Sequence, residues 1–342
     1  MIAEVGLWVF VGVISSLVVW KGSFWLEDAS ENLCTYYRLP YIVKGAVVTA
    51  FGSSFPEVSS VVLATVIHGE FDLGVGSVVG SAIFNILVIP AVAGLYFKSD
   101  MELSRKIADK EAKFYMVSVS AIIILFCLAV IYNPVESSSE ALKAYVSPYL
   151  ALIPIMLYLV YIFDQWQEVK DSDDERENVE LEISVWKQWG LLLSSLLMIG
   201  AGIEALVRSV LFFGEISGVP SFILGAVIVA GVTSAPDTIV SIRQSRAGQG
   251  VASLANVFGS NTFDLLIAVP AGIILAGGAV VNFSASIILL SILVGVTVIV
   301  FVVIRTGLDL KRSEGYLLLG IYAVFVIWIS LEAFSITEII PS

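Results

Sequence analysis

The sequence contains ten long apolar runs separated by short polar segments. Each run has about 20 residues or more, which is the length that a helix needs to cross the ~30 Å hydrocarbon core of a bilayer. Hydrophobic residues make up 58% of the chain and charged residues only 14%, whereas soluble domains carry about 25% charged residues. The charges are too few to cover a water-exposed surface, so the sequence excludes an ordinary soluble enzyme and predicts an integral membrane protein.

The order of the runs predicts an all-α polytopic membrane protein with ten transmembrane helices joined mainly by short loops. The N-terminus, Met1-Ile2-Ala3-Glu4, lacks the basic region that opens a cleaved signal peptide, so we expect the first run to be retained as a span. The expected helices cover roughly residues 5–25, 40–67, 73–97, 114–133, 146–165, 189–212, 219–243, 250–276, 283–304 and 315–336.

The distribution of lysine and arginine predicts the orientation of these helices, because cytoplasmic loops are enriched in both residues. If the N-terminus lies outside, all 18 basic residues except Lys143 and Arg208 fall on the inner side. We therefore expect both termini to lie outside the cell, in a protein of the plasma membrane.

The longest connection, residues 166–188, is predicted to be an acidic cytoplasmic loop. The stretch from Asp171 to Glu182 has the acid-rich rhythm of a calcium-binding loop, but Arg176 stands where such a loop needs glycine for its turn. A calcium sensor in this loop is therefore disfavoured.

Bulk charge and cysteine content limit the partners. The net charge of -12 argues against nucleic acid. Cys34 and Cys127 lie far apart in the sequence, and Cys127 falls within an apolar run, which disfavours a disulfide and leaves too few ligands for a metal-thiolate site. We expect membrane lipid around the protein, no cofactor and no obligate protein partner.

The chain also repeats itself at an offset of 180 residues, which becomes 179 further along. The correspondence covers helices one to three and six to eight. Most matches are identities, and an acid is replaced by another acid in one pair. The corresponding positions include Gly45-Ala46-Val47 with Gly225-Ala226-Val227, Ser54 with Ser234, Pro56 with Pro236, Glu57 with Asp237, Ser81 with Ser260, and Asn85 with Asp264.

Corresponding helices are five spans apart, so the two copies cross the membrane in opposite directions. We expect a first five-helix repeat over residues 1–165, with its motif at 45–87, and a second over 189–342, with its motif at 225–266. Inverted repeats are typical of secondary transporters, which bind their substrate near the midplane. Gly22 and Gly202 also correspond, and for these two we favour close helix packing over a role in binding.

Each motif holds an acid near the middle of a span. Glu57 ends the run Gly52-Ser53-Ser54-Phe55-Pro56-Glu57, and Asp237 ends Val232-Thr233-Ser234-Ala235-Pro236-Asp237. A carboxylate at that depth costs at least a few kcal/mol, so it is expected to face a cavity or a partner. Lys44 and Arg243 lie near helix ends, where they can reach the interface. A bound cation is then the natural counter-charge.

Further oxygens gather around each acid, because residues three or four apart share one face of a helix. The prolines add to them, since Pro56 and Pro236 each free the carbonyl four residues earlier, at Gly52 and Val232. For the serines of the first repeat, a hydroxyl bonded back to its own helix is an equally good explanation. The candidate ligands are Ser53, Ser54, Ser81, Thr233, Ser234 and Ser260, the amide of Asn85, and the carboxylates of Glu57, Asp237 and Asp264.

A site made only of oxygen favours hard cations such as Ca²⁺, Na⁺ or Mg²⁺. Zn²⁺ or Cu⁺ would call for histidine or cysteine, and the single histidine, His68, falls at a loop. Three carboxylates can neutralise one divalent ion or several monovalent ions. An exchange of one for the other is a physical basis for antiport.

The two motifs resemble those of the calcium/cation antiporter superfamily, whose repeats carry G-[ST]-S-x-P-[ED] followed by a helix with G-S-x-x-x-[ND]. The ten-span layout also fits that superfamily. The runs His68-Gly69-Glu70, Val79-Gly80-Ser81-Ala82-Ile83-Phe84-Asn85-Ile86-Leu87 and Gly259-Ser260-Asn261-Thr262-Phe263-Asp264 are most similar to the potassium-dependent sodium/calcium exchangers. The G-N-x-x-E motif typical of the proton-coupled branch is absent.

The resemblance implies that Glu57 and Asp237 are the central calcium ligands, with Asn85 and Asp264 beside them and the six hydroxyl residues lining calcium or sodium sites. It also implies backbone carbonyl ligands just before each motif, and these map onto Ala50 and Ala230.

The sequence departs from the superfamily pattern at two positions. Val232 stands where the second motif usually has glycine, and Asp237 stands where many microbial relatives have glutamate. An acid at the position of Asp264 accompanies potassium use in the potassium-dependent branch, but potassium-independent relatives carry one as well. Potassium dependence is therefore left open.

The expected function is a secondary active antiport of Na⁺ for Ca²⁺ by alternating access, and not an enzyme. We expect the first and sixth helices to slide across a more static bundle, because both are glycine-rich and give no acid to the cluster; in the superfamily these two helices move. The alternatives are a proton-coupled antiporter of Ca²⁺ or Mg²⁺ with the same fold, and a non-transporting scaffold. An intramembrane aspartyl protease is disfavoured, because the Gly-x-Gly-Asp motif is absent.

Overall fold

The computed structural model describes residues 2–37, 50–96, 105–136, 141–170, 184–246, 250–307, 312–337 and 339–340. Within these residues, nine helical stretches are long and apolar enough to cross a membrane. The shorter α2 (Ala50–His68) supplies the tenth expected span, and residues 40–49 of that span lie outside the described part of the chain. The prediction of a ten-span helical membrane protein is confirmed.

The spans follow the expected order, and two of them are interrupted. The seventh is built from α7, η2 and α8, and the eighth from α9, η3 and α10, where η2 and η3 are π-helical turns. The other bounds are α1 (Ile2–Tyr36), α3 (Phe71–Tyr96), α4 (Arg105–Tyr132), α5 (Pro148–Lys170), α6 (Val185–Ser217), α7 (Ser221–Leu224), η2 (Gly225–Val229), α8 (Ala230–Arg246), α9 (Gly250–Phe263), η3 (Asp264–Ala268), α10 (Val269–Leu275), α11 (Phe283–Gly307) and α12 (Arg312–Ala333).

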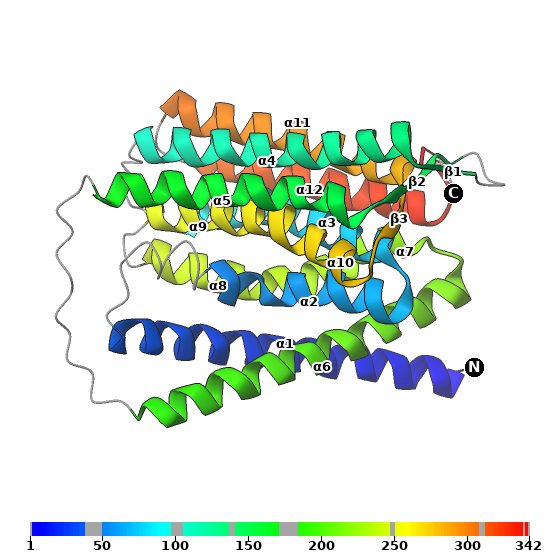
Figure 1. Ribbon diagram of the computed structural model, residues 1–342, viewed down its shortest axis with the longest axis horizontal. Coiled ribbons are helices and arrows are strands. Elements are labelled where there is room, and N and C mark those ends of the chain that lie inside the picture. The colour runs from blue at the N-terminus through cyan, green and yellow to red at the C-terminus, as the bar shows by residue number, and fades with distance from the viewer. Residues whose placement is uncertain are drawn as a thin grey trace.

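The start of α1 and the end of α12 lie at the same end of the bundle, as an even number of crossings requires (Figure 1). A small antiparallel sheet lies at that end, in the order β1 (Pro134–Val135), β2 (Lys143–Val146) and β3 (Ala279–Asn282). It pairs the connection between α4 and α5 with the connection between α10 and α11. The sheet is a small exception to the all-α prediction. It was not predicted because strands of two to four residues are too short to show a periodicity in the sequence.

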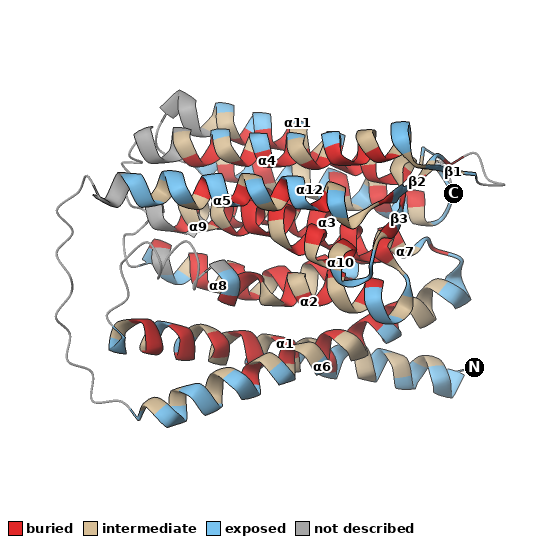
Figure 2. Ribbon diagram, in the orientation of Figure 1, coloured by how far each residue is buried: buried red, intermediate tan, exposed pale blue. Residues whose placement is uncertain are grey.

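The helices form a core and a peripheral pair. The core helix α3 contacts α2, α8, η2, α11 and α12, and is almost entirely buried (Figure 2). The two helices of the peripheral pair, α1 and α6, contact each other more extensively than they contact the core (Figure 1). These two helices have 35 and 33 residues, so each is on the order of 50 Å long and must tilt or extend beyond the hydrocarbon core.

Two glycines allow α1 and α6 to cross closely, in opposite directions. A Cβ added at Gly22 would lie 2.8 Å from Ile199 Cγ1, and one added at Gly202 would lie 2.8 Å from Val19 Cγ2. These two contacts are related by the 180-residue offset of the repeat, since Val19 corresponds to Ile199. The packing role that we favoured for both glycines is confirmed.

The crossing gives a prediction for stability. We expect Gly202→Leu to destabilise the folded protein by about 1–3 kcal/mol, because the added side chain must push into Val19. This would appear as a lower melting temperature of the detergent-purified protein, measured by size-exclusion chromatography after heating. Gly200→Leu is the matched control, since nothing lies within 4 Å of a Cβ at Gly200. Equal melting temperatures of the two variants would contradict the close crossing.

Candidate functional site

The three predicted acids lie deep inside the protein. Glu57 is in the middle of α2, Asp237 in the middle of α8, and Asp264 is the first residue of η3. Their exposed fractions are 0%, 1% and 0%. No ion pair joins any of them to a basic side chain in the part of the chain that the structure describes. The three carboxylates are within electrostatic range of one another, so each destabilises the negative charge of the others.

Hydrogen bonds join the two repeats at this site. Ser81 of α3 donates to Glu57 Oε1 at 3.3 Å and lies 2.7 Å from the hydroxyl of Ser234 in α8. Asn85 of α3 donates through Nδ2 to Asp237 Oδ2 at 3.1 Å. The alternative explanation for Ser81, a hydroxyl bonded back to its own helix, is therefore wrong, because this hydroxyl bridges side chains of both repeats.

Several oxygens at the site have no hydrogen-bond partner among the described residues. An unpartnered buried polar atom costs about 1–3 kcal/mol, and a charged one costs more. Such a concentration of acceptor oxygens therefore calls for positive charge. The unpartnered atoms are Ser54 Oγ, Glu57 Oε2, Asn85 Oδ1, Asp237 Oδ1 and both carboxylate oxygens of Asp264.

The remaining predicted ligands surround this set. Ser53, Ser234 and Ala230 are buried with the acids. Thr233 Oγ1 donates to the carbonyl of Ala230 at 3.3 Å, and the buried Ser260 donates to Asn256 O of its own helix at 2.7 Å. Ala50 begins α2, and the surroundings of its side chain lie outside what the structure describes.

The carbonyl that Pro236 frees has a partner that the sequence reasoning missed. Trp20 Nε1 of α1 donates to Val232 O at 2.8 Å. An indole can only donate, so it replaces the helical N–H that the proline lacks. A gap of 212 residues separates these two partners, and no local pattern pointed to the contact. It connects α1 directly to the helix that carries Asp237.

Two further features of the site were not predicted. The π-helical turn η2 ends just before Ala230, and η3 begins at Asp264; π-helical turns are frequent at functional sites. Asn261 of α9 is fully buried and hydrogen-bonded to Asn85. Its place beside Ser260 in the second motif was the only signal in the sequence.

The acids do not form a compact metal centre by themselves. No group of three or more His, Cys, Asp or Glu side chains within the described residues is placed to hold one metal ion. A cation between Glu57 and Asp237 would therefore need the neighbouring hydroxyl, amide and carbonyl oxygens as well, which is the mixed oxygen coordination that Ca²⁺ and Na⁺ accept.

The burial of Asp237 gives a second prediction. We expect Asp237→Asn to raise the melting temperature of the protein in cation-free buffer, because the change removes a buried charge that two other carboxylates repel. The same variant should lose the stabilisation that Ca²⁺ gives the wild type by binding to the folded state. Melting of both proteins in chelator and in excess Ca²⁺ measures both effects; a destabilised variant in chelator would contradict this account.

The chain is similar in sequence to proteins named as exchangers. The sodium/calcium exchanger MaX1 of Methanosarcina acetivorans is 24% identical over 337 residues, which cover 90% of this chain and 94% of that protein. The human sodium/potassium/calcium exchanger 3 is 35% identical over 132 residues, which cover 39% of this chain and 18% of that protein.

The fold is also that of a solved exchanger. The structure of the sodium-calcium exchanger NCX_Mj soaked with Na⁺ and Sr²⁺ superimposes with a TM-score of 0.62 and 22% identity, covering 94% of this chain and 99% of that one. The pattern of the family described as sodium/calcium exchanger protein matches residues 7–167 and 187–331, which is most of the chain. The chain belongs to the sodium/calcium exchanger protein family, a family of transporters and not of enzymes.

Proposed function

We propose that this protein exchanges Na⁺ for Ca²⁺ across the plasma membrane, with the inward Na⁺ gradient driving Ca²⁺ out of the cell. The observation that carries the proposal is the buried set of unpartnered oxygens on Glu57, Asp237 and Asp264, which two inverted repeats bring together. Membership of the sodium/calcium exchanger family supports the choice of ions.

The proposed Ca²⁺ ligands are the carboxylates of Glu57 and Asp237. Together they carry the charge that neutralises one divalent ion, and the unpartnered Oε2 of Glu57 and Oδ1 of Asp237 are available to bind it. The same oxygens, with Asp264, can instead hold several Na⁺ ions. The other proposed ligands are the side chains of Ser53, Ser54, Ser81, Asn85, Thr233, Ser234 and Ser260 and the carbonyls of Ala50 and Ala230.

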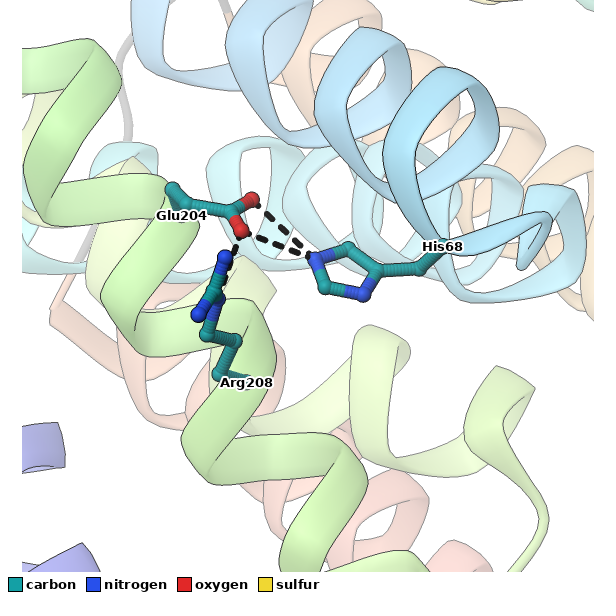
Figure 3. Close-up of polar contacts among 3 residues, drawn as sticks. All are labelled: His68, Glu204 and Arg208. Atoms are coloured by element: carbon teal, nitrogen blue, oxygen red, sulfur yellow. Dashed lines mark hydrogen bonds and ion pairs between the residues drawn. The ribbon is translucent and has the colours of Figure 1, made fainter.

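We further propose that α1 and α6 move as a pair to open the site to either side. Their close glycine crossing joins them to each other, and the pair also contacts α2 and α8 of the core, less extensively. One of these contacts joins Glu204 of α6 to His68 at the end of α2, with both Glu204 oxygens 3.1 Å from His68 Nε2 (Figure 3). Arg208 Nε, one turn along α6, donates to Glu204 Oε1 at 2.7 Å.

The proposed arrangement in the membrane follows the distribution of basic residues. Both termini and the sheet lie outside, and the segment 166–188 joins a repeat over residues 1–165 to a repeat over 189–342 on the cytoplasmic side. The part of that segment from 171 to 183, together with Arg176, lies outside the described residues, as do Gly45, Ala46 and Val47 of the first motif.

The coupling ion is tested by ⁴⁵Ca²⁺ uptake into proteoliposomes loaded with Na⁺. We expect uptake when an outward Na⁺ gradient is imposed and none when a proton gradient alone is imposed. The same assay with and without K⁺ determines potassium dependence, and excess Mg²⁺ tests competition by the other divalent candidate. Uptake driven by protons in the absence of Na⁺ would replace this proposal by the proton-coupled alternative.

The proposed ligands are tested in the same assay. Glu57→Gln keeps the size of the side chain and removes its charge, and we expect Na⁺-driven uptake to fall about 10- to 150-fold, as for the loss of one charged ligand contact of about 1.5–3 kcal/mol. Glu111→Gln is the matched control, because this buried acid of α4 already accepts hydrogen bonds from Tyr161 and Gln165. Normal uptake by Glu57→Gln would indicate that Glu57 is structural.

The proposed movement of α6 against α2 is tested by crosslinking. Cys34 and Cys127, the free cysteines of the structure, are first replaced by alanine. Cysteines then introduced by His68→Cys and Glu204→Cys are joined with a short bismaleimide. We expect the crosslink to stop exchange, while the uncrosslinked double variant and a monofunctional maleimide leave it active. Unchanged exchange in the crosslinked protein would rule out sliding of α6 over α2.

A further inference from the structure

The buried amide of Asn261 lies at one end of a chain of hydrogen bonds that reaches Asp237. Asn261 Nδ2 donates to the backbone oxygen of Ala82 at 3.2 Å, and Asn261 Oδ1 accepts from Asn85 Nδ2 at 3.2 Å. Asn85 Nδ2 also donates to Asp237 Oδ2 at 3.1 Å. Asn261 and Asn85 are both 0% exposed, so water does not compete for these bonds.

The groups at the two ends of this series of hydrogen bonds determine which atoms donate and which accept. A backbone carbonyl and a carboxylate can only accept, so Asn261 must turn its nitrogen to Ala82 and its oxygen to Asn85. Asn85 in turn must present its nitrogen, and both of its amide hydrogens are then used, one on Asn261 and one on Asp237. The one atom of the Asn85 amide left over is Oδ1, which is buried and has no hydrogen-bond partner among the described residues.

The two repeats are unequal at this position. By the 179-residue offset, Asn261 corresponds to Ala82, which has no side-chain amide. Asn261 donates to the carbonyl of that same residue, so the side chain of one repeat anchors on the backbone of its counterpart. Asn261 of the second repeat therefore binds the side chain of Asn85 in the first repeat. The methyl side chain of Ala82 cannot make the equivalent hydrogen bond in the other direction.

We propose that Asn261 is a positioning residue for the transported cation: it fixes the amide of Asn85 so that Asn85 Oδ1 stays free to bind the ion. The inference rests on the proposed function, because it needs a cation at this site. Asp237 alone orients Asn85 only while its carboxylate has a lone pair to spare. When Asp237 turns its oxygens to a cation, the bond from Asn85 to Asn261 is the one that keeps the amide from rotating.

The test compares Asn261→Ala with the wild type in equilibrium ⁴⁵Ca²⁺ binding to the purified protein and in the Ca²⁺ dependence of Na⁺-driven uptake. We expect the Ca²⁺ concentration at half-saturation to rise about 2- to 12-fold, as for the loss of one hydrogen bond, with the maximal rate at saturating Ca²⁺ unchanged. Asn256→Ala, on the same helix, is the matched control, because its buried Nδ2 has no hydrogen-bond partner in the described structure. Asn261→Ser replaces the alanine variant if that protein does not fold.

A double-mutant cycle with Asn85→Ala separates positioning from general stability. If Asn261 acts through Asn85, its removal has no further effect on Ca²⁺ affinity once Asn85 is alanine. Unchanged affinity in Asn261→Ala, or an equal loss in both backgrounds, would overturn the inference while leaving the exchanger intact. A wild type that binds Ca²⁺ but shows no Na⁺-driven uptake would overturn the proposed function alone, since the binding measurement still reads Asn261; a wild type that binds no Ca²⁺ would overturn both.

Discussion

The structure depends on the electrostatics of three carboxylates held in a medium that solvates charge poorly. Glu57, Asp237 and Asp264 have no basic partner in the described residues, and they repel one another. A fold that places them together is stable only if something positive joins them. If the proposed cation binds here, its binding and the stability of the fold are linked, because the ion supplies the charge that the buried acids lack.

Much of the fold was predictable from the sequence, because a membrane restricts the structures that a chain can adopt. A span must be long enough to cross the bilayer and must satisfy its own backbone hydrogen bonds, so each long apolar run is expected to be one helix. Accordingly, α3 (Phe71–Tyr96) begins and ends within a few residues of the expected 73–97. The repeat could be recognised in the sequence because Glu57 and Asp237 each follow a serine and a proline at the same spacing. Helical periodicity then placed Ser81 and Asn85 on one face, where the structure finds them bonded to Glu57 and Asp237.

The features that escaped prediction are contacts between helices remote in sequence. Trp20 reaches Val232 from another helix, and Asn261 reaches Asn85 from the opposite repeat. Neither follows from periodicity, since each depends on the angle at which two helices cross. The π-helical turns at Gly225–Val229 and Asp264–Ala268 also escaped prediction, for a different reason: one extra residue in a turn leaves no sign in hydropathy.

The small sheet has a consequence for how such a protein can move. Its middle strand β2 pairs with β1 of the first repeat and with β3 of the second, while α1 and α6 give no strand to it. Backbone hydrogen bonds of the sheet thus join the two repeats at one end of the bundle and oppose their separation there. In the movement that we propose, the frame is therefore a body that contains strands of both repeats, and the pair α1 and α6 is the moving part.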